Sequence, residues 1–111
     1  MWRTQGGDLH PNCNRMSHYI SLLRFTEQGA ANLKKSTARA HNFDKLAAKS
    51  GVTVVGQYWT LGEYDGVLIL SADSEKKVLL LLSALTGAGN VQTATLQAFT
   101  DGEFDDIVSG G

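Results

Sequence analysis

The sequence contains one cysteine, Cys13, and one proline, Pro11. A single cysteine excludes an internal disulfide and the structural zinc sites that need several thiolates, and it suits a reducing compartment. The longest apolar run, Val78 to Leu85, is interrupted by Ser83 and is far shorter than the roughly 20 residues that cross a bilayer. We therefore predict a cytoplasmic protein with no membrane partner.

Charge of one sign is also lacking, because 10 Lys and Arg residues are balanced by 11 Asp and Glu residues. The basic residues form no run longer than the pairs Lys34–Lys35 and Lys76–Lys77, so a nucleic-acid partner is not expected. At 111 residues, with 42% hydrophobic side chains, the chain has the size and composition of one globular domain.

The first 15 residues differ from the rest of the chain. Gly6, Gly7 and Pro11 fall in a stretch without helical or strand periodicity. We predict that residues 1–15 form a flexible extension and that residues 16–111 form a single domain.

Hydrophobic periodicity predicts alternating strands and helices over the remaining chain. The expected elements are a strand at 19–25, a helix at 31–49, strands at 52–61 and 66–72, a helix at 74–86, and a strand at 90–99. Ser36–Thr37 can interrupt the first helix, because serine is better suited to a helix cap than to a helix interior. Thr26 and Asp73 are suitable caps for the two helices, Gly51 suits a left-handed helix end, and Thr100 with Glu103 matches a capping box for a short terminal helix. This order predicts an α+β fold, a ferredoxin-like βαββαβ plait with a four-stranded antiparallel sheet.

Two helices can cover only one face of such a sheet. In the strand at 66–72, Val67 and Ile69 alternate with Leu68 and Leu70, so both faces of the sheet carry large apolar side chains. An apolar face left in water forfeits stabilisation and favours association. We therefore predict a homo-oligomer, most simply a dimer packed sheet to sheet.

Three stretches of the sequence, in this order and spacing, are typical of a known family. They are YISLLRFTEQG at 19–29, YWTLGEYD at 58–65, and GNVQT at 89–93 followed by Leu96 and Ala98 to Thr100. The chain resembles the GYD family, whose name corresponds here to Gly62, Tyr64 and Asp65, and the resemblance extends from His18 to Val108. It implies a dimeric α/β-barrel fold, in which two plaits join their sheets, and a family of unestablished biochemical function.

The predicted hairpin turn holds the first candidate ligand-binding residues, Tyr64 and Asp65. A phenol and a carboxylate at the mouth of a barrel can orient a small polar ligand. The alternative is structural: Asp65 would accept hydrogen bonds from the turn backbone, and Gly62 would supply a positive φ.

Trp59 and Arg24 complete the candidate set. Trp59 and Tyr58 point to opposite faces of their strand, so only one of them can line a given cavity. Arg24, on a central strand, either binds an anion or reaches water at the strand end.

Signatures of catalysis and cofactor binding are missing from the sequence. His10, His18 and His41 have no metal-ligand spacing, and Gly87-Ala88-Gly89 leads into a strand rather than into the helix that follows a phosphate loop. We predict no cofactor and no metal. Three functions remain open: a homo-oligomeric small-molecule binder, a cofactor-free oxygenase or isomerase of the dimeric α/β-barrel type, and a non-catalytic assembly or regulatory module.

Overall fold

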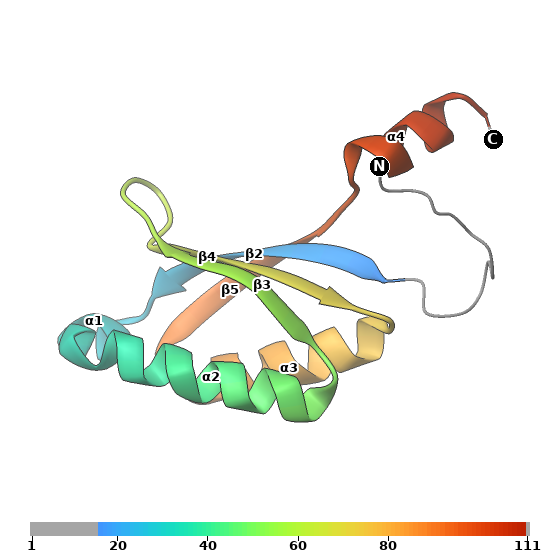
Figure 1. Ribbon diagram of the computed structural model, residues 1–111. Helices are drawn as coiled ribbons and strands as arrows, with labels where there is room; N and C mark the ends of the chain where they lie inside the picture. Colours follow the sequence, from blue (N-terminus) through green and yellow to red (C-terminus); the bar gives the residue numbers. More distant parts are fainter. Residues whose placement is uncertain (1–15, 111) are drawn as a thin grey trace.

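The computed structural model describes residues 16–110 and contains four strands in one antiparallel sheet of order β3-β4-β2-β5 (Figure 1). The strands are β2 (Ser17–Phe25), β3 (Thr53–Trp59), β4 (Gly66–Ala72) and β5 (Val91–Ala98). The helices are α1 (Glu27–Ala31), the 3-10 turn η1 (Leu33–Lys35), α2 (Ser36–Ser50), α3 (Glu75–Gly87) and α4 (Asp101–Val108). The predicted extension at residues 1–15 lies outside the described residues.

The two long helices, α2 and α3, lie on the same face of the sheet (Figure 1). The first of the described strands, β2, lies at the centre between β4 and β5. This arrangement confirms the predicted ferredoxin-like plait. The short helix α4 follows β5 and stands away from the sheet and from both long helices (Figure 1).

The start of the first helix differs from the prediction. Thr26 caps α1 as expected, with its side chain accepting from the Gly29 N–H, but the helix is interrupted at Asn32, whose φ of −119° is not helical. Arg39 donates to the Asn32 carbonyl at 2.9 Å, which gives that oxygen a partner outside a continuous helix. Leu33, which helical spacing with Ala40 and Phe43 would place on the buried stripe of a continuous helix, is 51% exposed.

Capping residues explain most of the other helix ends. Thr100 and Glu103 form the predicted capping box, and Gly51 ends α2 with a φ of 79°. The prediction that Asp73 caps α3 is wrong. Ser74 is the cap, with its side chain accepting from the Lys76 N–H, while Asp73 forms an ion pair with Lys77 at 2.9 Å.

The hydrophobic core lies between the sheet and the two long helices. Alternate residues of β2 and β4 supply one side, and one stripe from each helix supplies the other. The buried residues include Tyr19, Leu68, Leu70 and Ala72 from the sheet, Phe43 and Ala47 from α2, Val52 after α2, and Val78, Leu81 and Leu82 from α3. On each helix these residues recur at the spacing of a single buried stripe.

The opposite face of the sheet, which we call the outer face, is apolar and carries none of the described helices (Figure 1). Pairing registers place Ile20 opposite both Ile69 and Leu96, and Leu22 opposite Val67, on this face. On β5 the alternation places polar side chains on the face that meets the helices. There Thr95 and the fully buried Ser21 hydrogen-bond at 2.9 Å. Leu96 is consequently 54% exposed on the outer face.

Candidate ligand-binding site

A cavity of about 310 Å³ lies between the sheet and α2, next to the core. This volume is at the lower end of the range that small-molecule pockets occupy. Its walls are mainly apolar and come from both layers of the fold: Leu23 and Phe25 of β2, Trp59 of β3, Leu68 of β4, Ala40, Phe43 and Leu46 of α2, Ala84 and Leu85 of α3, and Val91 of β5.

Strand register explains why the sheet is hollow at this point. Gly66 lies directly between Trp59 on one neighbouring strand and Leu23 on the other. Because Gly66 has no side chain, the space above it stays empty between two large residues. A Cβ at this position would also lie 3.1 Å from the Tyr58 carbonyl oxygen, a tight contact that favours glycine.

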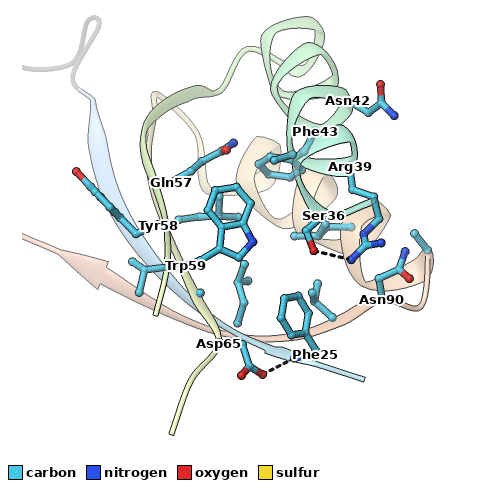
Figure 2. Close-up of a pocket in the computed structure, with 18 of the residues that line it drawn as sticks. Phe25, Ser36, Arg39, Asn42, Phe43, Gln57, Tyr58, Trp59, Asp65 and Asn90 are labelled. Atoms are coloured by element: carbon cyan, nitrogen blue, oxygen red, sulfur yellow. Dashed lines mark hydrogen bonds between the residues drawn. The ribbon is translucent and has the colours of Figure 1, made fainter. Parts of the chain in front are cut away.

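Trp59 projects into the cavity, whereas Tyr58 points away from it (Figure 2). Alternation along β3 predicts this opposition. Trp59 remains 52% exposed, so its indole ring forms part of the cavity wall and of the cavity opening.

Asp65 lies at the cavity and also ties the β3–β4 connection to the end of β2 (Figure 2). Its carboxylate accepts from the Phe25 N–H at 2.8 Å, and its own N–H donates to the Leu23 carbonyl at 2.8 Å. Gly62 in the same connection has the predicted positive φ, 109°. The carboxylate therefore bonds to the backbone of the neighbouring strand rather than to that of its own turn, and one of its two oxygens is used.

Arg24 and Tyr64 lie together at a different place, and neither lines the cavity. The Arg24 guanidinium forms an ion pair with Glu63 at 2.7 Å and lies over the Tyr64 ring, 4.8 Å from its centroid. Both members of the ion pair are substantially exposed. The structure thus divides the four predicted residues into two pairs, Trp59 with Asp65 and Arg24 with Tyr64.

Several cavity residues were missed in the sequence, above all Arg39, Ser36 and Asn90. Arg39 lies on α2 four residues before the buried Phe43, so a cation on the inward stripe was the signal that could have identified it. Asn90 follows α3 at the start of β5, and its backbone carbonyl accepts from the Thr26 N–H at 3.0 Å.

Within residues 16–110, no three His, Cys, Asp or Glu side chains gather as metal ligands. Over the same residues no helix is both long and apolar enough to cross a membrane.

Comparison with known proteins agrees with the predicted resemblance, because the GYD domain family matches residues 19–108. The chain belongs to the GYD family. A relative in Thermus thermophilus is 36% identical over 84 residues, which is 75% of this chain and 88% of the relative. That protein is named glutamine synthetase and cystathionine beta-lyase binding protein.

A solved structure shares the fold of this GYD chain. The crystal structure of MtbAldR aligns with a TM-score of 0.54 at 12% sequence identity. The alignment covers 90% of this chain but spans only 63% of the MtbAldR chain. At this identity the similarity concerns the fold alone.

Proposed function

We propose that this GYD protein binds a small molecule in the cavity between the sheet and α2, and that it does so as a homo-oligomer. The observation that carries the proposal is the cavity itself, which is apolar, open at one side and next to a well-packed core. A cavity with these properties is the usual place for a ligand in a small domain. The single cysteine of the chain supports a cytoplasmic location.

Three aromatic rings line the space proposed for the ligand. Trp59, Phe25 and Phe43 project from three different elements toward the same space (Figure 2). Asp65 is fixed through its Phe25 hydrogen bond and keeps a second oxygen for a ligand donor. For Arg24 and Tyr64 the contacts favour a role on the exposed surface of the hairpin instead.

The outer face supports the proposal of a homo-oligomer. Ile20, Leu22 and Ile69 lie there side by side across the central strands, and no described helix covers them. A second copy offers the same apolar surface, and two-fold symmetry makes that surface self-complementary. The occupant that we propose for the outer face is therefore a second copy of this chain.

Ligand binding in the cavity is tested by a substitution that fills the cavity. Ala40 lines the cavity from α2, so Ala40→Phe should place a ring in the ligand space. N-phenyl-1-naphthylamine, whose fluorescence rises in apolar sites, serves as a neutral probe. We expect the variant to bind this probe at least about tenfold more weakly than the unmodified chain. The matched control is Ala38→Phe, the same change at an exposed position of α2.

Thermal unfolding of both variants checks that they fold. Equal probe binding by the unmodified chain and by a folded Ala40→Phe variant would contradict binding in the cavity. Ala84→Phe introduces the same ring from α3 and provides a second test if the first variant is unstable.

A second candidate function is protein binding, because the Thermus thermophilus relative carries the name of a binding protein for two enzymes. Exposed apolar side chains are available for this purpose, such as Leu79 and Leu80 of α3, which are 68% and 69% exposed. Sedimentation of the purified chain with purified glutamine synthetase, and separately with cystathionine beta-lyase, would distinguish the two functions. Co-sedimentation lost on Leu79→Ser with Leu80→Ser, and kept in Ala40→Phe, would favour this second function.

A further inference from the structure

We infer that the ligand is an amphipathic organic anion, and that its acidic group binds at Arg39 while its apolar body fills the cavity. This inference rests on the proposed function and specifies its ligand class. It depends on three neighbouring side chains, Arg39, Ser36 and Asn90, which we call the donor edge of the cavity.

Arg39 is a half-buried cation without a described counter-charge. Its guanidinium donates to the Asn32 carbonyl at 2.9 Å and to Ser36 Oγ at 3.3 Å, which are both neutral acceptors. Over residues 16–110 the ion pairs found are Arg24 with Glu63 and Lys77 with Asp73, so no described carboxylate neutralises Arg39. A guanidinium has five N–H groups, and these two bonds leave three for a ligand.

Ser36 and Asn90 add donors beside the guanidinium (Figure 2). Ser36 Oγ accepts from Arg39, so its own proton is available to another group. The Asn90 side-chain oxygen accepts from Gln28 Nε2 at 3.1 Å, which fixes the orientation of its amide. The Asn90 amide nitrogen has no acceptor among the described residues. All three side chains can therefore donate to one anionic group.

The other cavity residues determine the chemical character of the rest of the ligand. Phe25, Phe43 and Trp59 offer apolar surface, so the ligand must bury an apolar body to fill the space. Asp65 carries the only described carboxylate on the cavity wall and repels an anion there, so the acidic group is directed toward Arg39. A carboxylate or sulfonate suits the forked guanidinium best, because two parallel hydrogen bonds can form.

Two probes with the same aromatic body separate charge recognition from cavity binding. 8-Anilino-1-naphthalenesulfonate is N-phenyl-1-naphthylamine with one added sulfonate. In Arg39→Gln we expect the affinity for the sulfonate to fall by about tenfold or more, while the affinity for the neutral probe stays within about twofold. Lys45→Gln removes one positive charge from an exposed position of the same helix and should change neither affinity.

Arg39 also holds the Asn32 carbonyl, so a purely structural role must be distinguishable. If the role of Arg39 is only structural, Arg39→Gln should weaken the binding of both probes equally and should lower the melting temperature. Either that result, or equal binding of the sulfonate by Arg39→Gln and the unmodified chain, would overturn the inference. The proposed function fails separately, when Ala40→Phe leaves the binding of both probes unchanged.

Discussion

Asp65 contributes to the fold and to the cavity with different atoms of one side chain. One carboxylate oxygen accepts from the Phe25 N–H at 2.8 Å, and the residue lies on the cavity wall. Asp65→Ala leaves a partly buried N–H without its partner, so we expect the free energy of unfolding to fall by about 1–3 kcal/mol. Asp65→Asn keeps an acceptor oxygen and should lose less. Urea denaturation of the two variants measures the difference, and an unchanged stability in Asp65→Ala would contradict this role.

The Asp73–Lys77 ion pair makes a pH-dependent contribution at the start of α3. The hydrogen bond from Lys77, aided by its positive charge, lowers the pKa of Asp73 below its ordinary value. Because the pKa of Asp73 is lower in the folded chain, the pair stabilises the fold at pH values above the ordinary pKa of an aspartate. This contribution is lost as the pH falls through the lowered pKa. We expect Lys77→Gln to raise the pKa of Asp73, as followed by NMR titration of its carboxyl carbon. An identical titration in the variant would show that Lys77 has no such effect.

The direction of a side chain was predictable where it depends only on alternation within one strand. The opposition of Trp59 and Tyr58 follows from alternation alone. The pairing of Arg24 with Glu63, and the position of Arg39 beside Asn90, join residues far apart in the sequence. Such pairs depend on tertiary register, which local patterns do not contain.

At the scale of elements, α1 packs against Asn90, the cavity-lining residue that precedes β5. Gly29 of α1 is buried against the Asn90 backbone, and a Cβ there would overlap the Asn90 carbonyl oxygen. The Thr26 N–H donates to that oxygen and fixes its position, so removing the overlap requires a movement of the main chain. We expect Gly29→Ala to lower the free energy of unfolding by roughly 1–3 kcal/mol and to weaken sulfonate binding at the donor edge.

Gly87→Ala provides the matched control for Gly29→Ala. Gly87 is the last residue of α3, and a Cβ there would meet nothing within 4 Å. Alanine is more favourable than glycine in a helix by about 1 kcal/mol, so the stability of Gly87→Ala should equal or exceed that of the unmodified chain. Chemical denaturation of both variants is the measurement, and equal effects would contradict the close packing at Gly29.

The order and type of the elements were predictable, while some of their ends were not. Strong alternation and helical stripes identified the four strands and both long helices. The interruption expected at Ser36–Thr37 is found where α2 begins at Ser36, but the break at Asn32, whose carbonyl accepts from Arg39, was not predicted. The cap of α3 was misplaced by one residue because Asp73 and Ser74 are both good caps, and the ion pair with Lys77 occupies Asp73.

At the scale of the whole molecule, the sequence predicted that both sheet faces are apolar but not which one meets the helices. Leu68 and Leu70 face the helices, whereas Val67 and Ile69 lie on the outer face. The cavity could not be predicted from the sequence, because it depends on this choice and on the position of Gly66 between Trp59 and Leu23.

The outer face carries the prediction of self-association. Ile69→Lys places a charge at its centre, and burying an unpaired charge is costly, so we expect the variant to be monomeric. Leu80→Lys changes an exposed leucine of α3 on the other side of the molecule and should leave the assembly intact. Light scattering after size-exclusion chromatography gives the masses. A monomeric unmodified chain, or an unchanged assembly in Ile69→Lys, would contradict association through the outer face.

Native mass spectrometry of the protein purified from its own host tests ligand binding most directly, because one spectrum reports the assembly and any molecule retained in it. We predict a homo-oligomer that carries a defined extra mass, and we predict that this mass is absent from Ala40→Phe prepared in the same way. Bare chains only, or the same extra mass on both proteins, would contradict a ligand in the cavity between the sheet and α2.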